Sequence, residues 1–134
     1  MKKLILAIDD SKAIRFLLQT VLGKDYQVVT APDGCSAMFW LSKRNLPGLI
    51  ILDAQLSDMQ DWEMVEQLST SGIYKDIPLI VLSSLEKEKV QAQCEQSGVS
   101  AYFTKPINPV DLMAVAERLL DNTQLTSARV AHAS

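Results

Sequence analysis

The chain has 134 residues, the size of one ordinary domain, with 48% hydrophobic and 22% charged residues; this balance is typical of globular proteins and argues against disorder. The formal net charge of -3 gives no sign of a broadly basic surface, so we expect no nucleic-acid partner. Two cysteines and one histidine exclude a disulfide framework, a cysteine-rich metal site and a histidine-based catalytic triad.

The N-terminal residues do not resemble a targeting signal. Met1-Lys2-Lys3 is followed by a short apolar run that ends in two acids, whereas a signal peptide needs a longer apolar region and a small-residue cleavage site. No stretch approaches the ~18 apolar residues of a membrane span. We therefore expect a soluble, cytoplasmic protein that does not enter a membrane.

The first half of the chain alternates short apolar runs, predicted as strands, with segments of helical period. In chain order we predict a strand at Leu4–Ile8, a helix with an apolar stripe from Ile14 to Leu22 that stops at Gly23, a strand at Val28–Ala31, a helix at Asp33–Ser42 and a strand at Leu49–Leu52. Continuous apolar runs such as Leu49–Leu52 are typical of parallel strands that are buried on both faces.

The second half continues the same alternation. We predict a helix at Asp61–Ser71 that ends near Gly72, a strand at Leu79–Leu82, a helix at Glu86–Ser97 that ends at Gly98, a strand at Ala101–Phe103 and a last helix capped by Asn108 with Pro109 in its first turn. Residues 122–134 are polar and small, and we expect a frayed tail there.

The predicted order of five strand–helix units indicates a doubly wound α/β fold. Right-handed crossovers between such units give an open parallel sheet with helices on both faces. Ligands of these sheets bind beyond the carboxyl ends of the strands. Functional residues are therefore expected among those that directly follow the predicted strands.

Acids, hydroxyls and one lysine follow four of the predicted strands. Asp9-Asp10 follow the first strand, Asp53 the third, Ser83-Ser84 the fourth, and Lys105-Pro106 come shortly after the fifth. Three carboxylates in one crevice repel one another, and a divalent cation with a preference for hard oxygen ligands, such as Mg²⁺, would relieve this repulsion. Lys105 could pair with a carboxylate or hold a phosphoryl oxygen.

This set of groups is suited to phosphoryl transfer, which requires positioning and charge neutralisation above all. Asp53, at the end of an expected central strand, is the best nucleophile. The chain contains neither G-x-x-x-x-G-K-[ST] nor G-x-G-x-x-G, so it has no obvious nucleotide-binding loop. The phosphoryl group would then arrive on a partner protein or a small phosphodonor.

These residues resemble the receiver domain of two-component response regulators over residues 1–121. The likeness is carried by Asp9-Asp10, by Asp53 after Leu-Ile-Ile-Leu, by Ser83, and by Lys105-Pro106. It implies a five-stranded sheet of flavodoxin-like order 2-1-3-4-5, residues 1–121 as receiver domain and 122–134 as tail. It also implies a phosphoacceptor signalling module that is not an enzyme, in the manner of a stand-alone chemotaxis-type receiver.

The resemblance implies specific residue roles. Asp53 accepts a phosphoryl group from a histidine kinase or histidine phosphotransfer protein. Asp10, Asp53 and the carbonyl of Gln55 bind Mg²⁺, and Asp9 helps through water. Ser83 and Lys105 contact the phosphoryl group. Tyr102 matches an aromatic switch position, and Lys105–Pro106 is a candidate cis peptide bond. Output would be protein–protein contact, since no output domain follows residue 121.

The loop after Asp53 departs from the family pattern. Ser57 stands where receivers have proline and Asp61 where they have glycine. Loss of proline loosens a loop, and loss of glycine argues against a left-handed backbone at that position. The geometry near Gln55 is therefore open, and the added acids Asp58 and Asp61 could change metal affinity.

Several alternatives remain at the level of sequence. Asp9-Asp10 could merely favour the start of a helix that Ser11 caps, Ser83 could form a capping box with Glu86, and Tyr102 could be plain core. Two other functions are possible. One is an unphosphorylated pseudo-receiver scaffold. The other is an aspartyl-nucleophile phosphohydrolase, which Gln55 disfavours because that class has an acid there. The chain could also be a fragment of a longer regulator.

Overall fold

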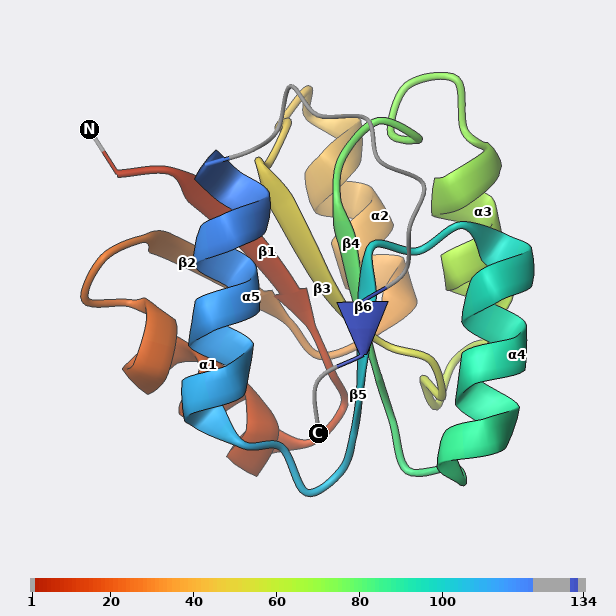
Figure 1. Ribbon diagram of the computed structural model, residues 1–134. Coiled ribbons are helices and arrows are strands. Elements are labelled where there is room, and N and C mark those ends of the chain that lie inside the picture. Colours follow the sequence, from red (N-terminus) through yellow and green to blue (C-terminus); the bar gives the residue numbers. More distant parts are fainter. Residues whose placement is uncertain (1, 122–130, 133–134) are drawn as a thin grey trace.

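Helices cover both faces of one parallel sheet in the computed structural model (Figure 1), which describes residues 2–121 and 131–132. The elements follow one another as β1 (Leu4–Ile8), α1 (Lys12–Leu22), β2 (Gln27–Ala31), α2 (Gly34–Ser42), β3 (Leu49–Asp53), α3 (Glu63–Thr70), β4 (Leu79–Ser83), α4 (Lys87–Ser97), β5 (Ala101–Thr104), α5 (Pro109–Asp121) and β6 (Ala131–His132). No helix among the described residues has the length and apolarity that crossing a membrane requires.

The strand order confirms the predicted doubly wound sheet and adds one strand at its edge. The first five strands lie in the order β2-β1-β3-β4-β5, and all neighbours are parallel. The two-residue β6 pairs with β5. The expectation of a frayed tail was therefore wrong for Ala131–His132, whereas residues 122–130 and 133–134 lie outside the described residues. A strand of two residues leaves no periodic pattern from which it could have been predicted.

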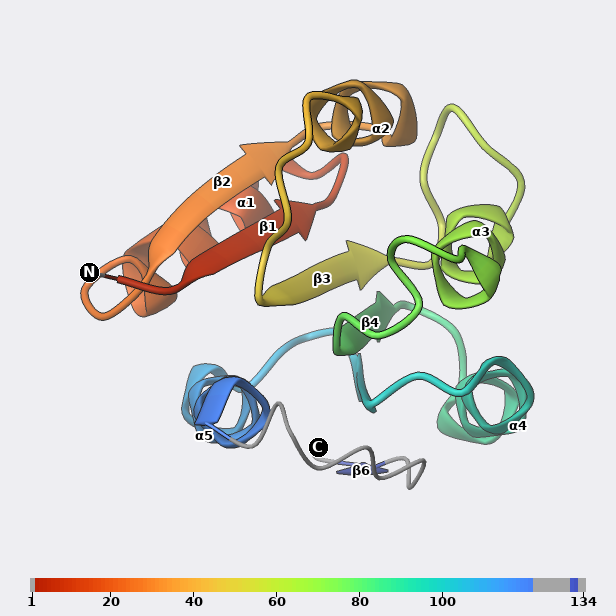
Figure 2. The same cartoon turned by 90° about the horizontal axis from the view of Figure 1, so that it is seen from above.

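Two apolar clusters, one on each face, hold the sheet. Successive strand residues point to opposite faces, so β3 sends Ile50 and Leu52 to one cluster and Leu49 and Ile51 to the other. The first cluster contains residues of α2, α3 and α4, and the second contains residues of α1 and α5. Figure 2 shows the same division of the helices about the sheet. The continuous apolar runs are thus explained by burial on both faces.

Helix starts agree with the predicted capping residues, with small shifts in the boundaries. Ser11 caps α1, and Asn108 accepts hydrogen bonds from two backbone N–H groups in the first turn of α5. Asp33 lies outside α2 as its N-cap, since its backbone is extended and its side chain accepts from the N–H of Ser36. Glu86 likewise precedes α4. The predicted helices include these cap residues, which accounts for the one-residue shifts.

The largest boundary error concerns α3, which begins at Glu63 instead of Asp61. The residue before it, Trp62, has a left-handed backbone with φ of 69°. A residue in this conformation cannot continue a right-handed helix in either direction. The predicted helix therefore included Asp61 and Trp62, which belong to the loop that follows β3.

Candidate functional site

The register of the sheet brings the polar residues that follow the strands to one edge. Ile8 pairs with Leu52, so the next residues, Asp9 just after β1 and Asp53 at the end of β3, lie side by side. Ser83 pairs with Thr104 at the ends of β4 and β5, and the N–H of Lys105 donates to the carbonyl of Ser83. The predicted convergence of these residues is therefore present.

Three carboxylates of the site lie close enough to share one cation. Asp9, Asp10 and Asp53 each offer an oxygen, and these oxygens lie within 4.8 Å of one another. Asp9 is fully buried, Asp53 is 4% exposed and Asp10 is exposed. Two buried acids and one open to solvent, all with hard oxygen donors, fit a magnesium ion that keeps several water ligands.

Lys105 is the counter-charge of the two buried acids. Its Nζ lies 3.1 Å from Asp9 Oδ2 and 3.1 Å from Asp53 Oδ2. Burial works to lower the pKa of the Lys105 ammonium, but the two carboxylates outweigh it and hold this pKa above its ordinary value. Lys105 is therefore a permanent cation at neutral pH, placed between both acids.

The environment of Asp53 shifts the pKa of its carboxyl upwards. Burial raises the pKa of the Asp53 carboxyl, and the neighbouring charge of Asp9 adds to this rise. The N–H of Gln55, which donates to Asp53 Oδ1 at 2.8 Å, and the Lys105 ammonium work in the opposite direction without cancelling it. A further positive charge beside Asp53 would therefore stabilise its carboxylate form.

We expect Asp53→Asn to raise the free energy of unfolding by roughly 1 kcal/mol near neutral pH in the absence of divalent cations. The pKa of Asp53 is higher in the folded state than its ordinary value of 3.8, so the folded state binds the proton more tightly. The ionised carboxyl then lowers stability above the folded pKa; this cost shrinks as the pH falls from the folded pKa towards 3.8 and is absent below 3.8.

Urea unfolding of both proteins in a chelating buffer at neutral and acidic pH measures this difference. The exposed Asp25, replaced by asparagine, is the matched control for loss of one negative charge. A variant less stable than the wild type at neutral pH would show that the ion pair with Lys105 outweighs burial.

Ser83 belongs to this site and does not cap a helix. Its buried hydroxyl accepts a hydrogen bond from the N–H of Leu85 at 3.0 Å and lies 3.5 Å from Gln55 Oε1. Glu86 is the N-cap of α4 and caps it without a side-chain hydrogen bond, so the alternative of a capping box is wrong. The amide of Gln55 also accepts from the N–H of Ser84, a contact that joins the loops after β3 and β4.

The other candidate residues occupy the fifth strand and its exit. Tyr102 is 1% exposed and packs in the cluster that contains α3 and α4. Burial raises the pKa of its hydroxyl. The Lys105–Pro106 peptide bond is cis. Asp10, which follows β1, does not cap α1, because the side chain of Ser11 accepts from the N–H of Ile14 and caps this helix.

The loop after β3 contains two features that the sequence did not indicate. The left-handed residue is Trp62, one position after Asp61, and its N–H donates to the carbonyl of Ala54 at 2.7 Å. Asp58 is separate from the cluster of three acids, because its carboxylate accepts from the N–H groups of Gly34 and Cys35 on α2. A contact across more than twenty residues has no local sequence signal.

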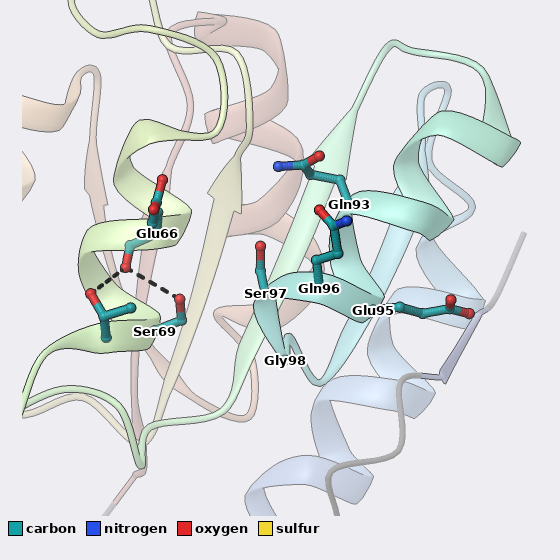
Figure 3. Close-up of a pocket in the computed structure, with 8 residues that line it drawn as sticks. Glu66, Ser69, Gln93, Glu95, Gln96, Ser97 and Gly98 are labelled. Carbon is teal, nitrogen blue, oxygen red and sulfur yellow. Dashed lines mark hydrogen bonds between the residues drawn. The ribbon is translucent and has the colours of Figure 1, made fainter.

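A groove between α3 and α4 is separate from the acidic site (Figure 3). It is lined by polar residues from the C-terminal parts of both helices. These helix ends lie at the amino ends of the strands, opposite the carboxyl ends where Asp53 lies. Figure 3 shows Glu66 and Ser69 on one wall and Gln93, Gln96 and Ser97 on the other. Among the residues that line the groove, no side-chain nucleophile is hydrogen-bonded to a basic side chain, as nucleophilic catalysis would require.

Comparisons with known proteins agree with this architecture. The model of the response regulator receiver domain matches residues 5–117. The chain is 32% identical over 130 residues to the transcriptional regulatory protein KdpE of Staphylococcus aureus, which covers 95% of this chain and 55% of that protein. It is 31% identical over 119 residues to the hybrid signal transduction histidine kinase D of Dictyostelium discoideum, which covers 89% of this chain and 8% of that protein.

Among solved structures, the chemotaxis response regulator CheY4 of Vibrio cholerae superposes with a TM-score of 0.78 at 27% identity, over 89% of this chain and 99% of that one. The chain thus spans about half or less of the two curated relatives above and nearly all of this solved structure. The similarity to the longer proteins concerns one part of each.

Proposed function

This chain belongs to the response regulator receiver domain family, and from that premise we propose that it is a phosphoacceptor module of a two-component phosphorelay. Receiver domains are generally signalling modules rather than enzymes. Asp53 would take its phosphoryl group from a histidine kinase or a histidine phosphotransfer protein, and output would be contact with a partner protein. The division into a receiver domain at residues 1–121 and a tail at 122–134, and the cytoplasmic location, stay predictions.

One observation carries the proposal: the ammonium of Lys105 and three carboxylates, two that follow β1 and one at the end of β3, lie together at one edge of the sheet. Asp9 and Asp53 share the ammonium of Lys105, and Asp10 adds a solvent-exposed carboxylate within reach of both. Holding two buried acids beside each other costs free energy. Such an arrangement is expected where the acids have a chemical task, and phosphoryl transfer uses each member of the set.

The transfer forms one bond and breaks another. A carboxylate oxygen of Asp53 attacks phosphorus, and the phosphorus–nitrogen bond of the donor phosphohistidine breaks. The imidazole nitrogen keeps that electron pair and takes a proton from solvent. Lys105 then holds a phosphoryl oxygen, while its second contact, to Asp9, keeps its Nζ in place.

The three acids would also provide the site for the cation that receiver domains bind. Asp10 and Asp53 with the Gln55 carbonyl would hold Mg²⁺ directly and Asp9 through water, and the ion would supply charge neutralisation for the phosphoryl oxygens. The Gln55 backbone is already tied to this place, because its N–H donates to Asp53 Oδ1.

Ser83 and Tyr102 are proposed to convert the new charge into a change at the surface. The Ser83 hydroxyl, which now contacts the Gln55 amide, would turn to donate to a phosphoryl oxygen. Because Leu85 N–H is bonded to the same hydroxyl, the loop between β4 and α4 would move with it. Tyr102 packs beside α4 in the same apolar cluster and would follow that movement.

The experiment is incubation of the protein with acetyl phosphate, with and without Mg²⁺, followed by mass spectrometry of the intact chain. We expect one added phosphoryl group in the presence of Mg²⁺, stable in acid and removed by hydroxylamine, as for an acyl phosphate. Asp53→Asn removes the nucleophile with little change in shape and is expected to abolish the added mass.

Two other outcomes would each replace the proposal. A folded wild type that stays unmodified would favour the unphosphorylated scaffold. Repeated turnover of a generic phosphate ester, lost in Asp53→Asn, would favour the phosphohydrolase.

A further inference from the structure

The loop after β3 is fastened to α2 by Asp58. Asp58 Oδ1 accepts from the N–H of Gly34 at 3.0 Å, and Oδ2 accepts from the N–H of Cys35 at 2.9 Å. These N–H groups have no intrahelical partner, because they lie in the first turn of the helix. A carboxylate is also favoured at this end of the helix by the helix dipole. Both oxygens of Asp58 are thus committed to α2.

The next residue of the loop adds apolar packing to the same contact. The side chain of Met59 packs against Gly34 so closely that a Cβ atom at residue 34 would lie 2.5 Å from Met59 Sδ, and Met59 would have to move to admit any larger residue. Gly34 is buried, although the loop beside it is open to solvent. Residues 58 and 59 therefore lie directly against the first turn of α2.

From this geometry we infer that Asp58 is a positioning residue for the backbone carbonyl of Gln55, the atom that would bind Mg²⁺. This inference rests on the proposed function. Gln55 and Asp58 belong to the same short loop, and Ser57 between them lacks the fixed φ that a proline would supply. A loop without that restraint samples more backbone conformations. The bidentate attachment to α2 replaces the missing restraint at the next residue.

The competing explanation is that Asp58 only completes the cap of α2. Asp33 already bonds the N–H of Ser36, so Asp58 could serve merely to satisfy the two remaining N–H groups. A cap of this kind would affect the stability of the fold and leave cation binding unchanged. The two explanations therefore predict different effects of removing Asp58: a cap alone lowers only the free energy of unfolding, whereas a positioning residue also lowers the affinity for Mg²⁺.

The chain offers a matched control in Asp61. This acid lies in the same loop, is exposed, and its carboxylate makes no hydrogen bond or ion pair within the described part of the chain. Asp58→Asn and Asp61→Asn each remove one negative charge near the site. A difference between them isolates the attachment to α2 from the general electrostatic effect of an acidic loop.

The test is a Mg²⁺ titration of the unphosphorylated full chain, followed by the NMR shifts of the Asp10 and Gln55 amides. We expect Asp58→Asn to raise the Mg²⁺ concentration at half-saturation by about 5-fold to 10-fold, towards the loss seen when groups that support metal ligands are removed. Asp61→Asn is expected to raise it by less than about 2-fold, as a screened surface charge would. Hydrogen exchange of the Gly34 and Cys35 amides would speed up in Asp58→Asn alone.

Two results would overturn the inference. In the first, Asp58→Asn lowers the urea midpoint but binds Mg²⁺ as Asp61→Asn does, which makes Asp58 a cap and no more. In the second, both variants weaken Mg²⁺ binding equally, which leaves only the charge of the loop. Failure of the proposed function would look different, because the wild type itself would then not bind Mg²⁺.

Discussion

Replacing Lys105 with methionine is expected to slow phosphorylation of Asp53 by about 10²-fold to 10³-fold at saturating Mg²⁺, the loss typical of removing one charge-stabilising donor from a transition state. Methionine matches the lysine side chain as far as Cε and removes the ammonium that lies 3.1 Å from Asp53 Oδ2. The measurement is the rate of mass gain with acetyl phosphate. Lys24→Met, at an exposed lysine, is the control and should phosphorylate at the wild-type rate.

The same variant is expected to lose roughly 3 kcal/mol of unfolding free energy without divalent cations, because two buried carboxylates are left without a counter-charge. Mg²⁺ would restore part of this stability, since it binds only the folded site. The loss would shrink on acidification, as the Asp53 carboxyl, whose pKa burial already raises, takes up its proton. Fast phosphorylation in a folded Lys105→Met protein would remove Lys105 from the mechanism.

Asp10→Asn is expected to weaken Mg²⁺ binding by at least about 10-fold. Removing a group that merely supports a metal ligand already costs about this much, and Asp10 would be a ligand itself. Asp10 is exposed and belongs to the group of three acids. Its removal should leave the free energy of unfolding within about 0.5 kcal/mol of the wild type, because Ser11 caps α1 without it. Isothermal titration with Mg²⁺ measures the first effect and urea unfolding the second.

The control for this experiment is Asp25→Asn, which removes the same charge from an exposed position in the connection between α1 and β2. It should bind Mg²⁺ as the wild type does. Equal weakening by both substitutions would mean that Asp10 acts through the net charge of the protein. Unchanged binding in Asp10→Asn would exclude it as a ligand.

The parts of the site that could be predicted from the sequence are those that depend on strand ends. Continuous apolar runs identify buried parallel strands, and parallel strands place the residues that follow them at one edge of the sheet. Asp9, Asp53 and Ser83 were predicted on this ground and lie there in the structure. The ion pairs of Lys105 could be expected only in outline, because which carboxylate it meets depends on side-chain packing.

The parts that could not be predicted depend on loops and on contacts between distant segments. Nothing in the sequence indicates a left-handed backbone at a tryptophan, and Trp62 holds it where the fold requires a turn before α3. The attachment of Asp58 to α2 likewise depends on where a loop and a helix meet in space. The amide of Gln55, which reaches the loop of Ser83 and Ser84, is a third case.

The central claim is that the carboxylate of Asp53 becomes bonded to phosphorus. Borohydride reduction of the phosphorylated chain, followed by digestion and peptide sequencing by mass spectrometry, tests this directly, because it converts an acyl phosphate of aspartate to homoserine at the modified residue. We expect homoserine at position 53 only after treatment with both phosphodonor and Mg²⁺. Reduction at Asp9, Asp10 or another carboxyl, with Asp53 unchanged, would contradict the account.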